Sequence, residues 1–498
     1  MGFNRIHEMV LHQVETRPDA LALIDSDGRE VTWLKYNALI LEAEALLKAN
    51  NVGAGERVMI VAENCLAVPV LIMAASRIGA WAVPVNARMS EPEIARIAEH
   101  ARPQLILFTS AISQEAADHA QGQAAQPITT GFGTLHILTT GITDPEQGDE
   151  AENVSILLYT TGTTGDPKGV MLTHANLIFT AESSTNLRNL TSADRVYGAL
   201  PLTHVFGVAS MRMASAWAGC TVLLAKRFTP AGLYEALCSG VTALPAVPQM
   251  HALLMSYAAD QGLTELGSDS LRYVSSGAAP LDPSWKRKAE VFYGLPLQNA
   301  YGMTETTAGV CGTRNAIDDP DISVGLPLPG VEIKLDLSVG EEADVGELLT
   351  KGPHIMKGYF RNLEATRAAM TEDGFLRTGD LGQIDEQGRV TIVGRAKELI
   401  IRGGFNVYPP EVEAALNDHP DVVQSAVIGH SVDGNEQILA FVQVRASNTP
   451  EDLSAFVAER LTGYKRPSQI HIVKQLPAAA TGKILKHQLA KKFADLIE

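Results

Sequence analysis

A stretch rich in hydroxyl groups and glycine, residues 159–169, has the composition of a phosphate-binding loop. It reads Tyr-Thr-Thr-Gly-Thr-Thr-Gly-Asp-Pro-Lys-Gly. Glycines let successive backbone N–H groups point toward one anion, threonine hydroxyls can bind phosphate or Mg²⁺, and Lys168 adds a point charge suited to phosphate. It is not a Walker A loop, because Lys168 lies between Pro167 and Gly169. We predict another kind of phosphate loop; the alternative is a Gly/Thr-rich surface turn.

Three further segments carry residues suited to the rest of a nucleotide. In the segment 301–305, Tyr-Gly-Met-Thr-Glu, a hydroxyl precedes a carboxylate, and such oxygen ligands can hold Mg²⁺ facing a triphosphate. The small residues of the segment 275–280, Ser-Ser-Gly-Ala-Ala-Pro, would let a flat ring lie against the backbone. The carboxylate of Asp380, which follows a glycine, suits ribose hydroxyls. The structural alternatives are a helix start, a tight connection and a turn aspartate.

The last hundred residues add positive charge and a second glycine pair. The segment 394–406 reads Gly-Arg-Ala-Lys-Glu-Leu-Ile-Ile-Arg-Gly-Gly-Phe-Asn. A narrow channel tolerates no side chain, so Gly403 and Gly404 are candidates for lining one; a hairpin with a glycine turn would also explain them. Residues 460–492 contain eight Lys or Arg and no Asp or Glu. This segment either attracts phosphates, with Lys465 and Arg466 as leading candidates, or is a solvated basic helix.

Taken in order, these motifs resemble the signatures of the adenylate-forming superfamily of acyl-CoA synthetases, luciferases and peptide-synthetase adenylation domains. The chain is most similar to AMP-forming acyl-CoA synthetases of the 4-coumarate–CoA and fatty-acid–CoA ligase kinds. The resemblance implies an acid–thiol ligase that uses ATP, Mg²⁺ and coenzyme A. The residues that would bind the nucleotide or CoA are Thr160, Thr161, Gly162, Thr163, Thr164, Gly165, Lys168, Gly277, Ala278, Ala279, Asn299, Ala300, Tyr301, Gly302, Met303, Thr304, Asp380, Arg395, Gly403, Gly404, Lys465 and Lys483.

The same resemblance assigns the chemical roles. Lys483, in a Pro-x-x-x-x-Gly-Lys context, would bridge the acid carboxylate and the α-phosphate and neutralise the charge that opposes their approach. Lys168, Thr160, Glu305 and His204 complete the catalytic set, and Thr160 and Glu305 would hold Mg²⁺. His204 would gate and orient the acid, although a lone histidine is more often a packed residue. Lys397 would be the hinge about which the small domain turns.

The acid is expected in a pocket of mostly small and apolar residues. By resemblance to 4-coumarate–CoA ligases, the pocket residues are His204, Phe206, Gly207, Ser210, Gly277, Ala278, Ala300, Gly302, Met303, Ala308 and Gly309. No Arg or Lys is evident there to pair a second carboxylate, although Arg212 is nearby, so a monocarboxylic acid is favoured. Ser210 could bond a ring hydroxyl, which favours a hydroxycinnamate-like or benzoate-like acid; a medium-chain fatty acid is the alternative.

Two other classes of function compete with this interpretation. One is an adenylating enzyme that loads a carrier protein, or an oxidative luciferase-like enzyme; the glycine pair favours free CoA instead. The other is a non-catalytic nucleotide-binding protein. The presence of Lys168, Glu305, Asp380 and Lys483 together argues against it.

Alternating strands and helices must position these motifs. Apolar runs at 58–61, 82–85 and 105–108 alternate with helical segments at 7–16, after Thr32 and at 67–78. After the loop, a helix at 174–188 and strands near 196–200, 221–224 and 273–275 continue the alternation, which predicts mostly parallel sheets flanked by helices. Residues 121–147 are poorer in apolar residues and are expected to loop over the surface.

We therefore predict a multi-domain α/β fold, because 498 residues exceed one ordinary core. Residues 1–394 would form a large N-terminal domain of two flanked β-sheets, with a small β-barrel subdomain at about 321–390. Residues 395–397 would form the hinge. Residues 398–498 would form a small, mobile α+β C-terminal domain.

Composition limits the partners. A net charge of −17 makes non-specific binding to nucleic acid or anionic membranes unfavourable. No apolar run has the length of about 18 residues that spans a membrane, and the N-terminus has no signal-peptide core. Four scattered cysteines without metal-type spacing favour a cytoplasmic protein with reduced thiols. The expected partners are a small carboxylic acid, ATP and CoA; a homodimer and a lysine acetyltransferase or deacetylase acting on Lys483 are further candidates.

Overall fold

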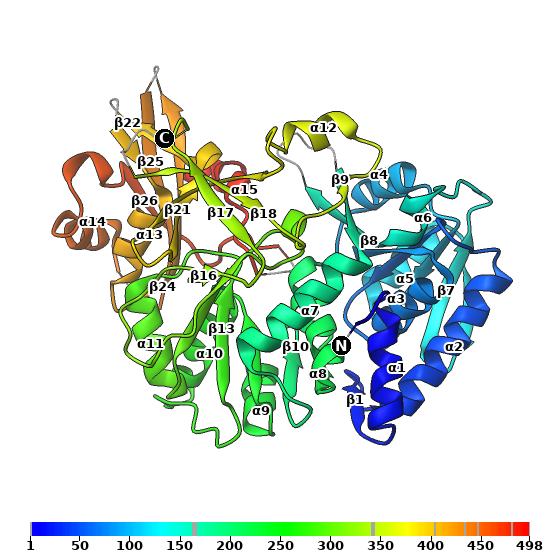
Figure 1. Cartoon of the computed structure of the whole chain (residues 1–498). Coiled ribbons are helices and arrows are strands. Elements are labelled where there is room, and N and C mark those ends of the chain that lie inside the picture. The colour runs from blue at the N-terminus through cyan, green and yellow to red at the C-terminus, as the bar shows by residue number, and fades with distance from the viewer. Residues whose placement is uncertain are drawn as a thin grey trace.

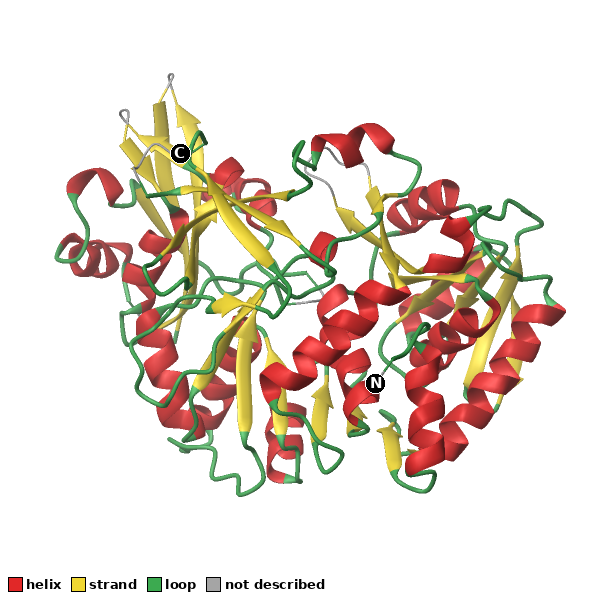
Figure 2. Cartoon of the chain, in the orientation of Figure 1, coloured by secondary structure: helices red, strands yellow, loops and turns green. Residues whose placement is uncertain are grey.

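The chain forms a large α/β body with a smaller α+β body at one corner (Figure 1). The computed structural model describes residues 2–161, 167–339, 344–402, 405–432, 435–445, 448–479 and 482–497. Helices lie along the outside of the large body, and its strands run between them (Figure 2). No helix in these ranges is long and apolar enough to cross a membrane.

The first sheet of the large body has the order β19-β9-β8-β4-β3-β5-β7-β6 within the described residues. Its strands are β3 (Arg57–Ala62), β4 (Trp81–Asn86), β5 (Leu105–Phe108), β6 (Gln126–Thr130), β7 (Gly133–Thr139), β8 (Val154–Thr161), β9 (Pro167–Thr173) and β19 (Gly358–Tyr359). The central strands are parallel, and β8–β9 and β6–β7 are antiparallel hairpins. Buried parallel strands read as continuous apolar runs, and this is why the sequence marks them clearly.

The second sheet has the order β16-β15-β14-β13-β12-β10-β11-β1-β2 within the described residues. Its strands are β1 (Leu21–Ile24), β2 (Glu30–Thr32), β10 (Arg195–Gly198), β11 (Thr221–Leu224), β12 (Ala243–Ala246), β13 (Tyr273–Gly277), β14 (Leu297–Tyr301), β15 (Cys311–Gly312) and β16 (Leu326–Pro327). The neighbouring strands in the part of this sheet that runs β1-β11-β10-β12-β13-β14 are parallel, so their carboxyl ends meet at one edge. Ligands of open α/β sheets bind outside this edge.

The helices of the large body cover these two sheets. They are α1 (His7–Thr16), α2 (Trp33–Ala49), α3 (Ala67–Ile78), α4 (Glu91–Ala101), α5 (Gln114–Gly122), α6 (Asp149–Asn153), α7 (His174–Arg188), α8 (Ala214–Ala218), α9 (Pro230–Cys238), α10 (Pro248–Asp260), α11 (Pro283–Tyr293) and α12 (Leu363–Ala368). The Thr173 hydroxyl caps α7 by accepting from the amide of Asn176. Helix α7 lies between the two sheets in Figure 1 and contributes Leu177 and Ala181 to the main core.

The small β unit expected as a barrel is a four-stranded antiparallel sheet in the order β17-β18-β20-β21. Its strands are β17 (Glu332–Asp336), β18 (Gly346–Lys351), β20 (Leu376–Ile384) and β21 (Val390–Arg395). The smaller body has its own cores. It contains β22 (Ile400–Arg402), β23 (Phe405–Val407), β24 (Val422–Val432), β25 (Asn435–Val444), β26 (Gln469–Ile472), α13 (Pro409–Asn417), α14 (Pro450–Ala458) and α15 (Lys486–Lys492).

One prediction was wrong. Residues 121–147, expected to form a surface loop, contain the β6–β7 hairpin, which pairs with β5 at the edge of the first sheet. An edge hairpin needs fewer apolar residues than a central strand because one side of it faces solvent. The apolar residues Phe132 and Leu135, which the structure buries, were the sign of this hairpin in the sequence.

Candidate active site

The predicted phosphate loop is the tip of the β8–β9 hairpin. Thr160 is paired with Lys168 across this hairpin, and Tyr159 is paired with Gly169. A Cβ atom at Gly169 would lie 3.1 Å from the ring of Tyr159, a tight contact that a larger residue could make only if the ring shifted. The candidates Gly162, Thr163, Thr164 and Gly165 lie outside the described residues, as does the side chain of Thr161. The hairpin therefore brings the Thr160 and Lys168 positions together at the end of the first sheet.

The second predicted segment is the sharp turn that follows β14. The short 3₁₀ helix Thr304–Thr306 carries Glu305, whose side chain is buried and accepts a 2.9 Å hydrogen bond from the Tyr359 hydroxyl. A Cβ atom at Gly302 would overlap the carbonyl group of Ala308, so only glycine fits this close approach. Thr307 and Ala308 both have positive φ angles, which is unusual for residues other than glycine. The turn thus holds Glu305 in one place.

A buried carboxylate joins this turn to the small β unit. Asp380 on β20 accepts a 2.6 Å hydrogen bond from the Tyr301 hydroxyl at the end of β14. The Nε atom of Arg395, at the end of β21, lies 3.0 Å from the other carboxylate oxygen of Asp380. The structure therefore brings together three residues that the sequence places in separate motifs.

The predicted wall for a flat ring lies next to this group. Strands β13 and β14 are parallel neighbours, with Gly277 paired to Ala300 and Ser276 paired to Asn299. Ala278 follows β13 with a φ of 68° and is exposed, as is Ala279. The side-chain amide of Asn299 donates to the carbonyl of Ser323 at 3.0 Å, which gives this residue a structural task. Small residues thus mark the carboxyl ends of two adjacent strands.

Lys483 reaches this area from the other end of the chain. Its loop is closed by a bridge between Ala478 and Ile484 and a hydrogen bond from the amide of Ala479 to the carbonyl of Lys483. A Cβ atom at Gly482 would lie 2.8 Å from the side chain of Val247, so the loop packs directly on the large body.

The charges of neighbouring residues show which groups surround the amine of Lys483. Partial burial lowers the pKa of Lys483, the charge of Arg395 lowers it further, and the charge of Asp380 opposes this change. The positive charge of Lys483 also contributes to a lowered pKa of His204. The lysine therefore lies within electrostatic range of both the Asp380 group and His204.

His204 begins the segment expected to bind the acid. Burial lowers the pKa of His204 to about 4, and the charge of Lys483 adds to this effect, so the imidazole is neutral near pH 7. Its Nδ1 atom accepts from the amide of Phe206 at 3.3 Å. A π-helix, Phe206–Met213, follows it, and the ring of Phe206 would be 3.4 Å from a Cβ atom at Gly277. Gly207 has a packing role, because a Cβ atom there would overlap the carbonyl of Pro201.

Two buried arginines lie near this segment: Arg212, which the sequence analysis placed nearby, and Arg188, which it missed. Arg188, at the end of α7, donates to the carbonyl and the hydroxyl of Ser210, the latter at 2.6 Å. Ser184 is also bonded to the Ser210 hydroxyl, at 3.1 Å. Arg212 instead faces the rings of Trp33 and Tyr36, with centroid distances of 5.9 Å and 5.0 Å. An arginine at the end of a helix looks like an ordinary capping residue in sequence, so no local signal identified Arg188.

The remaining candidates lie in or near the smaller body. Lys397 is exposed within the 3₁₀ helix Ala396–Glu398, directly after β21. Gly403 and Gly404 lie outside the described residues, between β22 and β23, which pair as an antiparallel hairpin. The amine of Lys465 lies 2.7 Å from the carboxylate of Glu411 within the same body. This contact gives Lys465 a role inside the smaller body.

The residue set fits a nucleotide with Mg²⁺. No group of three or more His, Cys, Asp or Glu side chains in the described ranges could hold a metal ion by itself. Mg²⁺ is usually bound by one or two carboxylates together with substrate phosphates, so a single buried carboxylate such as Glu305 suffices. Lys168 and Lys483 would supply the positive charge that phosphates require in a chain of net charge −17. Asp380 supplies a buried acceptor for hydroxyl groups.

Comparison with known proteins gives the class and then the family. Residues 10–360 match the AMP-binding enzyme model, and residues 411–483 match the AMP-binding enzyme C-terminal domain. The chain is 32% identical to 4-coumarate–CoA ligase 2 of Oryza sativa subsp. japonica, over 98% of this chain and 92% of that protein.

Solved structures agree with these matches. ATP-bound MatB from Rhodopseudomonas palustris superimposes with a TM-score of 0.85 at 28% identity, covering 99% and 100% of the two chains. O-succinylbenzoate coenzyme A synthetase from Bacillus subtilis, in complex with ATP and magnesium, superimposes with a TM-score of 0.80 at 29% identity, covering 97% and 98%.

The fold and site define a two-body α/β enzyme of the AMP-forming acid–thiol ligase class. The chain belongs to the AMP-binding enzyme family. The predicted superfamily and fold class are confirmed.

Proposed function

We propose that this enzyme joins a carboxylic acid to coenzyme A in two steps that consume ATP. In the first step a carboxylate oxygen attacks the α-phosphorus of ATP, and pyrophosphate leaves to give an acyl-AMP. In the second step the CoA thiol, after losing its proton, attacks the acyl carbonyl, and AMP leaves with the electrons of the broken C–O bond. The relatives named above as CoA ligases support this reaction class.

The observation that carries the proposal is the approach of Lys483 to Asp380 and Arg395. Lys483 comes from the smaller body, and the charges of Arg395 and Asp380, which form an ion pair with each other, act on its pKa. Asp380 would accept hydrogen bonds from the ribose hydroxyls, and Lys483 would offset the charge of the α-phosphate and the incoming carboxylate. Lys168 would neutralise the leaving pyrophosphate. Thr160 and Glu305 would hold Mg²⁺, which supplies further charge neutralisation when bound.

The neutral state of His204 supports a role in orienting the acid. A neutral imidazole next to the reacting carboxylate can accept or donate a hydrogen bond without adding a competing positive charge. The neighbouring Phe206 ring and Gly277 backbone would flank the acyl group. His204 would therefore orient the acid and gate its entry, and it would not transfer a proton.

We further propose that the two half-reactions use one site in turn. A large domain of residues 1–394 and a small domain of residues 398–498 would rotate about the hinge 395–397, with Lys397 at the pivot. The position of Lys483 near Arg395 and Asp380 supports assigning the arrangement described above to the first step. Rotation would withdraw Lys483 and bring Gly403 and Gly404 in to line the CoA channel. Acetylation of Lys483 would stop the first step by removing its charge.

The acid is proposed to be an aromatic acid of the hydroxycinnamate or benzoate type. The expectation of a single carboxylate rested on the absence of Arg or Lys from this pocket, and the hydrogen bond from Arg188 to Ser210 removes that ground. The buried group of Ser184, Arg188 and Ser210 supports this choice, because a ring oxygen would find hydrogen-bond donors there. The alternative is a medium-chain fatty acid. Its methyl end would bring no hydrogen-bond acceptor to the buried charge of Arg188. The names of the relatives, 4-coumarate–CoA ligase and O-succinylbenzoate coenzyme A synthetase, also point to aromatic acids.

A panel of acids tests the proposal. Pyrophosphate release is measured for hydroxycinnamates, benzoates and fatty acids of six to ten carbons, with and without CoA. We expect release with aromatic acids, and AMP release only when free CoA is present. AMP release with a carrier protein but not with CoA would favour the carrier-loading alternative. Absence of pyrophosphate release with every acid would favour a non-catalytic nucleotide-binding protein.

A further inference from the structure

A single tyrosine contacts two of the groups proposed to hold Mg²⁺ and the ATP phosphates. The Tyr359 hydroxyl donates to Oε1 of Glu305 at 2.9 Å. The amine of Lys168 lies 5.0 Å from the centroid of the Tyr359 ring, within the range of a cation–π interaction. One side chain therefore links two segments that are more than a hundred residues apart in sequence.

The backbone around Tyr359 is tied to the same two segments. The amide of Met356 donates to the carbonyl of Glu305 at 2.9 Å, so both the main chain and the side chain of Glu305 are held. The amides of Lys357 and Phe360 donate to the carbonyls of Met171 and Gly169 on β9, at 3.0 Å and 2.7 Å. Strand β19 thereby joins the edge of the sheet that carries the phosphate loop.

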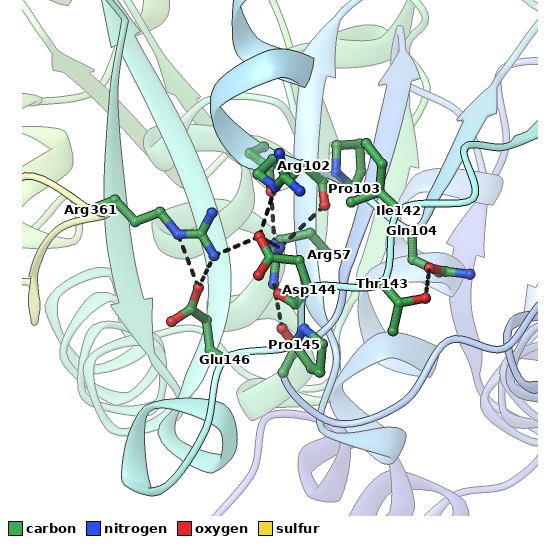
Figure 3. Close-up of polar contacts among 12 residues, drawn as sticks. Arg57, Arg102, Pro103, Gln104, Ile142, Thr143, Asp144, Pro145, Glu146 and Arg361 are labelled. Carbon is green, nitrogen blue, oxygen red and sulfur yellow. Dashed lines mark hydrogen bonds and ion pairs between the residues drawn. The ribbon is translucent and has the colours of Figure 1, made fainter.

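The residues that follow Tyr359 are anchored at the other side of this sheet. Figure 3 shows Arg361 reaching Asp144 and Glu146, with distances of 2.8 Å and 2.6 Å from its Nη2 atom. Asp144 also binds Arg102 at 2.8 Å. The ring of Phe360 packs edge-on against Trp81, with centroids 5.7 Å apart. Contacts of the residues before and after Tyr359 thus fix its position. A residue that orients other side chains must itself be held in place.

We propose that Tyr359 is a positioning residue that orients the Glu305 carboxylate for Mg²⁺ and holds the Lys168 amine toward the phosphates. A hydrogen bond to one carboxylate oxygen fixes the plane of the group and so fixes the other oxygen as well. The ring face restrains the lysine, whose long side chain would otherwise sample many rotamers. This inference rests on the proposed function, because it assigns Glu305 and Lys168 to the metal and the phosphates of ATP.

Two substitutions separate the two contacts. Tyr359→Phe removes the hydroxyl and keeps the ring, whereas Tyr359→Leu removes both. The control is Tyr293→Phe, because the hydroxyl of Tyr293 is also bonded to a buried side chain, His251, at 2.8 Å. Unfolding temperatures of all variants report any loss of folding. Binding of α,β-methylene-ATP is measured by calorimetry over a series of Mg²⁺ concentrations, and binding of AMP is measured in EDTA.

For Tyr359→Phe we expect the Mg²⁺ concentration at half-saturation to rise by about 10-fold, the lower end of the effect of losing an outer-shell partner. Binding of AMP without metal should stay unchanged. Tyr359→Leu should in addition weaken the metal-free affinity for the triphosphate analogue. Tyr293→Phe should match the wild type in the Mg²⁺ concentration at half-saturation, in AMP binding without metal and in the metal-free affinity for the triphosphate analogue.

A double-mutant cycle tests the link to Glu305 itself. In a Glu305→Gln background, Tyr359→Phe should cause no further change in Mg²⁺ dependence, because the carboxylate that it positions is gone. An equal effect in both backgrounds would mean that Tyr359 is only structural. Normal Mg²⁺ dependence of Tyr359→Phe in an otherwise wild-type chain would overturn the inference and leave the proposed function intact. A wild-type protein without Mg²⁺-dependent binding of the analogue would overturn both.

Discussion

Asp380 and Arg395 face each other across the β20–β21 pair, and the Nε atom of Arg395 lies 3.0 Å from the Asp380 carboxylate. Asp380 is also bonded to the Tyr301 hydroxyl at the end of β14. The ion pair therefore lies where the proposed nucleotide site and the start of the smaller body meet.

Replacing Asp380 with Asn should weaken ATP binding. The substitution keeps the shape and removes a charge-assisted acceptor, a loss that corresponds to a rise of about 10- to 100-fold in the KM for ATP. Steady-state kinetics with a saturating acid measure this change. Asp385→Asn is the matched control, because Asp385 pairs with Arg389 on the surface, in the turn between β20 and β21. A similar rise in both variants would argue against a role of Asp380 in binding ribose.

Replacing Lys483 with Ala should stop the first half-reaction and spare the second. Removal of one stabilising charge from the transition state lowers the rate of pyrophosphate release by about 100- to 1,000-fold or more. Thioester formation from a supplied acyl-AMP and CoA should continue at the normal rate. The exposed Lys474→Ala is the control. If the variant loses both half-reactions, Lys483 does not act in adenylation alone.

Replacing Gly404 with Leu should have the opposite effect. A side chain in the proposed CoA channel would block thioester formation while pyrophosphate release continues, and acyl-AMP would accumulate on the enzyme. Gly122→Leu, at a position where a Cβ atom meets nothing within 4 Å, is the control. Quenched-flow separation of the two steps measures the effect. Normal thioester formation by Gly404→Leu would refute the channel.

Mild acid should destabilise the fold through His251. Burial lowers the pKa of His251 to about 4, from 6.5, although its contact with the Ser275 carbonyl opposes this change. Between these two values the unfolded chain binds the proton and the folded chain does not, so stability falls as the pH drops from 6.5 to 4. The full contribution is about 3 kcal/mol.

Urea unfolding at several pH values tests this expectation. His251→Gln should show a smaller loss of stability in this window, and replacement of the exposed His487 by Gln should leave the slope as in the wild type. An unchanged slope in His251→Gln would contradict the assignment.

The local motifs of this chain were predictable, and the links between them were not. Gly302 was recognisable as part of a motif in the sequence, and the structure shows that a close approach to the Ala308 carbonyl excludes a side chain there. Asp380 was recognisable from its neighbours, but its bond to Tyr301 depends on two sheets meeting. Tyr359 and Arg188 lie in segments with ordinary local composition, and only the folded chain shows that they reach Glu305 and Ser210. The β6–β7 hairpin escaped prediction for the same reason, because its partner strand decides its structure.

The packing of Gly207 has a practical consequence for changing which acids the enzyme accepts. Its backbone lies against the carbonyl of Pro201, so any larger residue there would displace the segment that carries His204. Ser210 is likewise committed to Arg188. A directed-evolution library for new acids would therefore leave these two positions unchanged and vary Phe206, whose ring would be only in ordinary van der Waals contact, at 3.4 Å, with a Cβ atom at Gly277.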